Sequence, residues 1–379
     1  MTKSRHLIVF GTRPEAIKMA PLVHHALSQT NWEVKVCVTG QHREMLDQVL
    51  DFFAISPDFD LNLMRPNQNL YSLTADIITS LKPVLEEFNP DYVYVHGDTT
   101  TSTAAGIAAF YSGAKVCHVE AGLRTFNRQY PFPEEFNRTL TGKIADYHFA
   151  PTPTSAANLK RENTAESAIC ITGNTVIDAL FKGLEIVEQP NYSNPEIEQL
   201  KGLLDPQKRL ILITGHRREN HGDGLEAICK SLSQIASANA DVELIYPVHL
   251  NPNVKGPVNE YLQGISNIHL VDPLAYPAFI WLMKRSHIII TDSGGIQEEA
   301  PSLGKPVLVT RTTTERPEAV EAGTVLLVGT DVELIVAETQ KLLDDPQQYE
   351  KLSQLHNPYG DGKACERIVS FMNQIQHGT

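Results

Sequence analysis

The sequence has few cysteines and few positive charges for its length of 379 residues. Its five cysteines are scattered and include no Cys-x-x-Cys pair, so we expect reduced thiols and neither a disulfide framework nor a zinc site. Asp and Glu number 45 against 32 Lys and Arg, which gives a formal net charge of −13. Because an overall basic field is absent, we expect no nucleic acid and no anionic membrane surface among the partners.

Long hydrophobic runs are also absent. The apolar run near the start covers only residues 7–10, which is too short for the core of a signal peptide. No stretch approaches the roughly 18 apolar residues that a membrane span requires. Together with the unpaired cysteines, these absences predict a cytoplasmic protein.

The sequence does contain a regular alternation of short β-branched runs and longer amphipathic segments, which is typical of parallel α/β sheets. We expect strands at residues 7–10, 34–39, 92–95, 115–119 and 147–150, and a second series at 210–214, 243–247, 268–271, 288–291, 307–309 and 324–327. The restart of this rhythm predicts two doubly wound, Rossmann-like domains. Their boundary is expected near residue 173, with a linker through residues 188–194.

Ligands of open α/β sheets bind outside the carboxyl ends of the strands, so the residues that follow each strand are the candidates. The first strand is followed by Gly11-Thr12-Arg13, and Lys18 lies one turn further along. A glycine turn that opens a helix can hold a phosphate, and Arg13 would add a charge-assisted hydrogen bond. The alternative is a tight turn with a surface arginine. The segment is not Gly-x-Gly-x-x-Gly, and no acid follows the second strand, so we expect no NAD.

Carboxylates follow two neighbouring strands of the first series. Asp98 comes after the strand at 92–95 and Glu120 after the strand at 115–119, so both point into one crevice. For Asp98, the alternative is a helix N-cap. Glu134 and Glu135 add a third acidic group in an expected loop at 126–136. The spacing of His118 and Glu120 suits metal chelation, but the sequence offers no third ligand and we expect no metal.

Residues that suit an anionic ligand follow the strands of the second series. His216 and two arginines follow the strand at 210–214, and Ser293-Gly294-Gly295 follows the strand at 288–291. A Ser-Gly-Gly segment that opens a helix directs N–H groups at a diphosphate. Glu299 can accept hydrogen bonds from ribose hydroxyls, and Arg316 adds a cation. These features predict a nucleoside diphosphate site.

Taken together, these segments resemble the non-hydrolysing UDP-N-acetylglucosamine 2-epimerases. The resemblance extends over nearly the whole chain and is carried by FGTRPEAIKMAPL, QHREMLDQVL, VHGDTTT, HVEAGLRT, PEEFNR, TGHRREN, TDSGGIQEEAPSLGKPVLV and TERPEAV. It implies a glycosyltransferase-B-type architecture with an interdomain cleft, a homodimer, and UDP-N-acetylglucosamine and UDP as ligands, with no cofactor. It also implies that residues 361–379 return to the first domain, 1–173, which carries the catalytic acids, whereas 174–360 bind UDP.

The resemblance also implies roles for individual residues. The catalytic positions are Asp98, Glu120, Glu134 and His216, and the substrate-binding positions are Arg13, Lys18, Phe279, Ser293, Gly294, Gly295, Glu299 and Arg316. An additional UDP-N-acetylglucosamine, acting as an allosteric activator, is implied at Gln41, His42, Arg43 and His249. The alternative for the first three of these is a polar loop and a helix start.

The chemistry of the sugar then selects a mechanism. The hydrogen on C2 has no neighbouring carbonyl to acidify it, so C3 must be oxidised transiently by NAD or UDP must leave as C2 loses its proton. Since the NAD fingerprint is missing, we expect elimination and re-addition of UDP through 2-acetamidoglucal, which interconverts UDP-N-acetylglucosamine and UDP-N-acetylmannosamine for bacterial surface polysaccharides. The alternatives are a hydrolysing relative that releases N-acetylmannosamine, a glycosyltransferase of this architecture, and a nucleotide-sugar-binding regulator.

Overall fold

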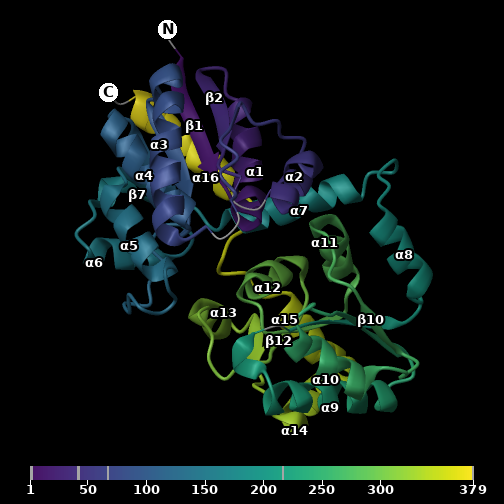
Figure 1. Cartoon of the computed structure of the whole chain (residues 1–379). Coiled ribbons are helices and arrows are strands. Elements are labelled where there is room, and N and C mark those ends of the chain that lie inside the picture. Colours follow the sequence, from purple (N-terminus) through teal and green to yellow (C-terminus); the bar gives the residue numbers. More distant parts are fainter. Residues whose placement is uncertain (1–2, 41–42, 66–67, 216, 378–379) are drawn as a thin grey trace. The chain divides into compact units, whose positions relative to one another are not determined.

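A computed structural model describes residues 3–40, 43–65, 68–215 and 217–377 of the chain (Figure 1). The chain divides into two compact units, which are Met1–Lys182 with Tyr359–Thr379 (unit 1) and Gly183–Pro358 (unit 2). Each unit contains one parallel sheet with alternating helices. The predicted class, two Rossmann-like α/β domains, is confirmed.

The sheet of unit 1 has seven strands in the order β3-β2-β1-β4-β5-β6-β7. Its first six positions follow the strand order of dinucleotide-binding folds. The strands are β1 (Ser4–Phe10), β2 (Trp32–Val38), β3 (Phe59–Asp60), β4 (Tyr92–His96), β5 (Lys115–Val119), β6 (Tyr147–Ala150) and β7 (Ile169–Ile171). The edge strands β3 and β7 have two and three residues, too few to show a hydrophobic pattern, and the sequence did not predict them.

Helices cover this sheet and bury its apolar side chains. They are α1 (Arg13–Leu27), α2 (Arg43–Phe52), α3 (Leu70–Phe88), α4 (Thr100–Ser112), α5 (Glu134–Ile144), α6 (Pro153–Arg161), the 3₁₀ turn η1 (Glu166–Ala168), α7 (Thr175–Val187), which continues into unit 2, and α16 (Ala364–His377). One buried cluster joins β1, β4 and β5 to α3 and α4. Helix α16, drawn in yellow in Figure 1, packs against α1 in purple, so the end of the chain belongs to unit 1.

The start of α5 differs from the expected loop at residues 126–136. The helix begins at Glu134, so Glu134, Glu135 and Phe136 form its first turn. Pro133 occupies the N-cap position, and carboxylates are favoured in a first turn by the partial positive charge of the helix N-terminus. The loop therefore ends earlier, and the acidic pair is held on a helix.

The sheet of unit 2 has the order β10-β9-β8-β11-β12-β13. Its strands are β8 (Arg209–Thr214), β9 (Val242–Pro247), β10 (Ile268–Val271), β11 (Ile288–Thr291), β12 (Val307–Val309) and β13 (Val325–Leu327). The helical elements are α8 (Pro195–Leu203), η2 (Arg218–Asn220), α9 (Asp223–Ala238), α10 (Pro252–Leu262), α11 (Tyr276–Arg285), α12 (Gly294–Glu299), η3 (Ala300–Leu303), α13 (Pro317–Glu321), α14 (Val332–Asp344) and α15 (Pro346–Ser353). Among the described residues of the chain, no helix has the length and apolar character that a membrane crossing demands.

Candidate active site

The turn after β1 is filled by a side chain of its own helix. A Cβ on Gly11 would lie 1.9 Å from Thr39 Oγ1, so only glycine allows this close approach. The backbone N–H groups of Gly11 and Thr12 donate to the buried carboxylate of Glu15 at 3.1 and 2.8 Å. The prediction that this turn holds a phosphate is therefore wrong for these two N–H groups, because an internal carboxylate already takes their hydrogen bonds.

Helix α1 supplies the cation that pairs with Glu120. Arg13 is its first residue and is partly exposed, and Lys18 follows in the second turn. Lys18 Nζ donates to Glu120 Oε2, and both side chains are mostly buried. The structure thus brings Lys18 and Glu120 together from elements that are 102 residues apart.

Glu120 follows β5 in a backbone conformation that a residue with a Cβ rarely adopts. Its φ is +61°, in the left-handed region. Its carboxylate also accepts from Asn174 Nδ2 at 2.9 Å, and His96 Nε2 lies 3.7 Å away. Burial lowers the pKa of His96 to about 4, so the ring is neutral near pH 7. Strained, over-determined positions of this kind are concentrated at functional sites.

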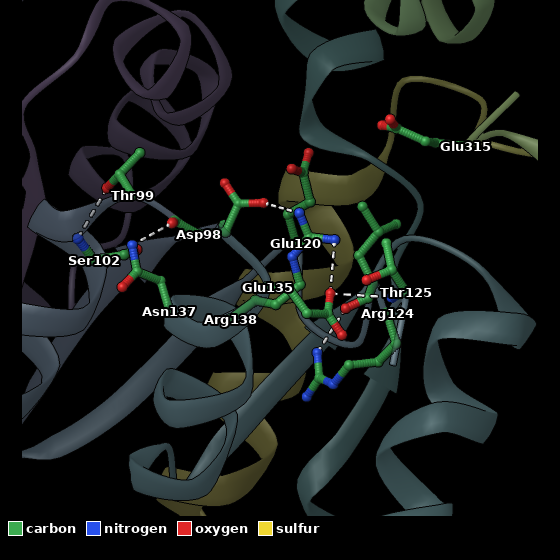
Figure 2. Close-up of polar contacts among 12 residues, drawn as sticks. Asp98, Thr99, Ser102, Glu120, Arg124, Thr125, Glu135, Asn137, Arg138 and Glu315 are labelled. Carbon is green, nitrogen blue, oxygen red and sulfur yellow. Dashed lines mark hydrogen bonds and ion pairs between the residues drawn. The ribbon is translucent and has the colours of Figure 1, made fainter. Parts of the chain in front are cut away.

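Asp98 follows β4 and does not cap α4. The cap is Thr99, whose side chain accepts from Ser102 N at 3.0 Å, so the alternative role for Asp98 is excluded. Its carboxylate instead accepts from Arg138 Nη2 at 2.5 Å, as Figure 2 shows. Burial raises the pKa of Asp98, and the Arg138 charge opposes this rise. The Asp98 side chain keeps 28% of its surface exposed, so a ligand can reach it.

The two acids that begin α5 have different environments. Glu135 is buried, and its carboxylate accepts from Thr125 N at 3.0 Å (Figure 2). It also accepts from Phe126 N at 2.9 Å. The Glu134 side chain is partly exposed, and within the described chain its carboxylate makes no hydrogen bond or ion pair. Glu134 is therefore the acid of this pair that is available to a ligand.

The candidate metal pair does not form a metal site. His118 is buried, and its Nε2 lies 2.7 Å from Gly97 O, while burial lowers the pKa of the ring to about 3. Glu120 is engaged by Lys18 and Asn174. Across the described ranges, no group of three or more His, Cys, Asp or Glu side chains is arranged to hold a metal ion.

In unit 2, two arginines converge on the first glycine of α12. A Cβ on Gly294 would lie 3.8 Å from Arg217 Nη2 and 3.8 Å from Arg316 Nη2. Arg316 Nε donates to the buried carboxylate of Glu298, which holds the guanidinium in place. Arg217 N donates to Asp292 Oδ2 at 2.9 Å, which fixes the loop after β8. The arrangement concentrates positive charge beside a glycine backbone, which suits a phosphate.

Of the other predicted residues of unit 2, Ser293 and Glu299 lie beside or on α12, whereas Phe279 lies on α11. Ser293 precedes Gly294, and the buried Glu299 has its Oε2 3.7 Å from the position of a Cβ on Gly295. Phe279 is partly buried on α11. His216 lies outside the described residues.

The predicted allosteric residues are only partly described. Arg43, at the start of α2, forms ion pairs with Asp47 at 2.9 Å and with Asp60. His249 is exposed in unit 2, and its Nδ1 accepts from Asn251 N at 3.1 Å. Gln41 and His42 lie outside the described residues.

Sequence reasoning missed two residues that contact the acids, Arg138 and Asn174. Arg138 lies inside the segment PEEFNR and Asn174 lies at the expected domain boundary near residue 173, but neither directly follows a predicted strand. The sequence analysis expected a loop at residues 126–136 and no helix from Glu134, whereas a helix that begins there places Glu134 and Arg138 one turn apart on a shared face.

Known proteins resemble this chain over nearly its whole length. The family model described as UDP-N-acetylglucosamine 2-epimerase matches residues 25–373. The chain is 59% identical to the UDP-N-acetylglucosamine 2-epimerase of Escherichia coli K12, over 97% of each chain. It is 50% identical to the Neisseria meningitidis 2-epimerase solved with UDP-GlcNAc, with a TM-score of 0.87 over 98% of this chain and 100% of that one.

More distant structures extend the likeness. The Methanocaldococcus jannaschii 2-epimerase, solved with UDP-GlcNAc and UDP, is 33% identical, with a TM-score of 0.77 over 98% of this chain and 99% of that one. A sucrose-phosphate synthase from Thermosynechococcus elongatus is 13% identical with a TM-score of 0.65 over both whole chains, so it shares the glycosyltransferase-B-type fold alone. The chain therefore belongs to the UDP-N-acetylglucosamine 2-epimerase family.

Proposed function

We propose that the protein interconverts UDP-N-acetylglucosamine and UDP-N-acetylmannosamine by inverting C2 of the sugar. The observation that carries this proposal is the pair of carboxylates at the ends of β4 and β5. Asp98 remains partly exposed against a buried arginine, and Glu120 is held by Lys18 in a strained conformation. Binding of an anionic nucleotide alone would gain nothing from such acids, whereas proton transfer requires them.

The proposed reaction is elimination followed by re-addition. One carboxylate removes the proton from C2 while the C1–O bond breaks, and UDP leaves with the electron pair as a C1–C2 double bond forms. A second carboxylic acid then returns a proton to the opposite face of C2, and UDP adds again at C1. Asp98, Glu120 and Glu134 are the proposed carriers of these protons, and His216 is the fourth proposed catalytic residue.

Negative charge builds on the departing diphosphate, so its stabilisation lowers the barrier. We assign this role to Arg316 and the Ser293-Gly294-Gly295 segment, with Arg13 and Lys18 contributing from unit 1. Glu299 is the proposed partner of the ribose hydroxyls, and Phe279 is the proposed contact on the uracil side. In this proposal unit 1 supplies the acids and unit 2 holds UDP.

The test is incubation with UDP-N-acetylglucosamine alone in D₂O, followed by NMR. We expect UDP-N-acetylmannosamine with deuterium at C2, and traces of 2-acetamidoglucal and UDP, because the intermediate is held only by noncovalent contacts. Added NAD should change nothing. Retention of the original hydrogen at C2, or a requirement for NAD, would contradict elimination. Release of free N-acetylmannosamine would identify a hydrolysing enzyme, and a requirement for an acceptor would identify a glycosyltransferase.

We propose that the protein works as a homodimer in the cytoplasm, where it supplies N-acetylmannosamine units for bacterial surface polysaccharides. An exposed apolar surface of unit 1 supports the dimer. It comprises Leu70, Tyr71 and the partly buried Ile78 of α3, Tyr111 of α4, Phe132 of the loop before α5 and Phe136 of the first turn of α5. Phe110 of α4 lies beside Tyr111, with ring centroids 6.2 Å apart. Monomeric proteins rarely leave a contiguous apolar patch of this kind in water. All five cysteines are unpaired, which fits a reducing compartment.

We also propose that UDP-N-acetylglucosamine activates the enzyme at a second site that includes Gln41, His42, Arg43 and His249. The M. jannaschii relative solved with both UDP-GlcNAc and UDP supports the binding of two nucleotide molecules. Forward rates should rise sigmoidally with substrate in the wild type and hyperbolically in Gln41→Ala. A hyperbolic wild-type curve would remove the reason for a second site.

A further inference from the structure

A buried arginine connects Asp98 to the acidic first turn of α5. Arg138 donates to Asp98 Oδ2 at 2.5 Å, and its Nη1 lies 3.4 Å from Glu135 Oε2. The side chain of Arg138 is 8% exposed and that of Glu135 only 2%, whereas Asp98 is 28% exposed. Figure 2 shows the guanidinium between the carboxylates of Asp98 and Glu135. The guanidinium is thus buried, whereas Asp98 keeps an exposed surface that a ligand can reach.

Burial of this arginine is costly, because a charged group loses its hydration and needs hydrogen-bond partners inside a protein. Arg138 Nε has no hydrogen-bond partner within the described chain, so the pairing is incomplete. A hydrophobic residue of similar size would often be at least as stable at such a position. The ion pair is therefore poorly explained by stability alone.

The neighbours of Arg138 fix its direction. Glu135 is anchored by the backbone N–H groups of Thr125 and Phe126, so it cannot turn away from the guanidinium. On the other side, Asn137 Nδ2 donates to the Asp98 backbone carbonyl at 2.9 Å. Consecutive residues of α5 therefore hold both the backbone and the carboxylate of Asp98.

We propose that Arg138 is a positioning residue of the epimerase reaction, which aims the Asp98 carboxylate at the sugar and sets the pH range in which Asp98 is charged. This inference rests on the proposed function. Arg138 does not touch the substrate in this role. It acts through Asp98, and its planar donor fork suits the task because it serves two carboxylates at once.

The other titratable groups around Asp98 lie after β5, on α1 and at the end of β4. Glu120 after β5 raises the pKa of Asp98, and Lys18 on α1 lowers it. His96 at the end of β4 is neutral near pH 7, because burial lowers its pKa to about 4. Among these groups, Arg138 makes the direct hydrogen bond to the carboxylate. Its removal should therefore let burial raise the pKa of Asp98 further.

The experiment compares pH profiles of kcat for the wild type, Arg138→Met and Arg138→Lys with UDP-N-acetylglucosamine. In Arg138→Met, one limb of the profile should move to higher pH by about one unit or more, because a charge in contact lowers a carboxyl pKa by that amount. At the optimum, kcat should fall roughly 10- to 100-fold, with KM and UDP affinity unchanged. Arg138→Lys should restore the limb, since it keeps the charge, but only part of kcat.

A matched control is Arg124→Lys. Arg124 is also buried and pairs with Glu162 through two hydrogen bonds of 2.7 and 2.9 Å. The Arg124→Lys substitution should lower the melting temperature without moving either limb of the pH profile of kcat. If Arg138→Met does not fold, Arg138→Gln, which keeps an N–H donor, replaces it in the same experiment. The same limb of the pH profile of kcat must again move to higher pH.

Unmoved limbs in a folded Arg138→Met or Arg138→Gln protein, with only a lower melting temperature, would overturn the inference and leave a structural ion pair. A wild-type enzyme without epimerase activity would instead contradict the proposed function. The two failures are therefore distinguishable.

Discussion

At the scale of single residues, the three candidate acids differ in what holds them. Asp98 is paired with a buried arginine, and Glu120 is paired with a lysine and an asparagine. The carboxylate of Glu134 has no polar partner within the described part of the chain. Carboxylates in such unlike environments are suited to unlike tasks, because a base must be charged and an acid must carry a proton.

We expect Asp98→Asn, Glu120→Gln and Glu134→Gln each to reduce turnover at least ~100-fold, because each removes a proton carrier. UDP should still bind all three variants, since the diphosphate is assigned to unit 2. Steady-state rates and titration calorimetry with UDP measure the two effects. Glu166→Gln, which removes an 81% exposed carboxylate, is the control and should behave as the wild type. Loss of UDP binding along with turnover would show that the acids are structural.

A second residue-scale prediction concerns the arginines around Gly294. Arg217→Gln and Arg316→Gln should each weaken UDP binding about 10- to 100-fold, the usual worth of a hydrogen bond to a charged group. The control is Arg218→Gln, because Arg218 is adjacent in sequence but exposed. Titration calorimetry with UDP measures the dissociation constant of each variant. Equal losses for Arg217→Gln and Arg218→Gln would indicate a general charge effect and not a site at Gly294.

At the scale of elements, the strands of unit 1 bury four histidines in neutral form. They are His6 on β1, His96 at the end of β4, His118 on β5 and His148 on β6. Burial lowers the pKa from 6.5 to about 3 for His6 and His118, and to about 4 for His96 and His148. His6 also stacks on Trp32, with ring centroids 3.8 Å apart.

These histidines predict acid sensitivity of unit 1. Above pH 6.5 these histidines are neutral in both the folded and the unfolded chain, so the free energy of unfolding keeps its full value. Below pH 6.5 the histidines take up protons only in the unfolded chain, until the folded-state pKa is reached. Each histidine should therefore reduce the free energy of unfolding by about 1.4 kcal/mol per pH unit well below pH 6.5, until the folded-state pKa is reached. Urea unfolding between pH 7.5 and 5 tests this dependence.

Trp281→Phe leaves Trp32 as the sole tryptophan, so its fluorescence reports unit 1 alone. In the Trp281→Phe background, His6→Gln should reduce the slope of the free energy of unfolding against pH by about 1.4 kcal/mol per pH unit, which is the contribution of one histidine. An unchanged slope would show that His6 does not titrate on unfolding.

At the scale of the whole molecule, the apolar surface on α3 and α4 predicts self-association. Light scattering should give twice the chain mass of 42.0 kDa for the wild type. Phe110→Asp should produce monomers, because the Phe110 side chain is 62% exposed and a charge there would have to be desolvated in an interface. Leu334→Asp, at a 41% exposed apolar position of unit 2, is the control and should remain dimeric. A monomeric wild type would contradict the proposal.

Much of the fold follows from the sequence by itself. The alternation of β-branched and amphipathic segments is a local property, so the bounds of β5, β6, β10, β11 and β12 agree with those predicted. The family could also be recognised from the sequence, since its motifs are runs of adjacent residues. The edge strands β3 and β7 escaped prediction, because so few residues carry no periodic signal and only pairing with a neighbouring strand defines them.

The roles of individual side chains were decided only by the tertiary structure. Asp98 could be a cap or an acid until Thr99 was found to cap α4 and Arg138, 40 residues away, was found to pair with Asp98. The turn after β1 offered N–H groups for a phosphate until Glu15 was seen to occupy them. The physical reason is the same in both cases. A polar group is satisfied by whichever partner folding brings within about 3 Å, and the sequence pattern does not record which partner that is.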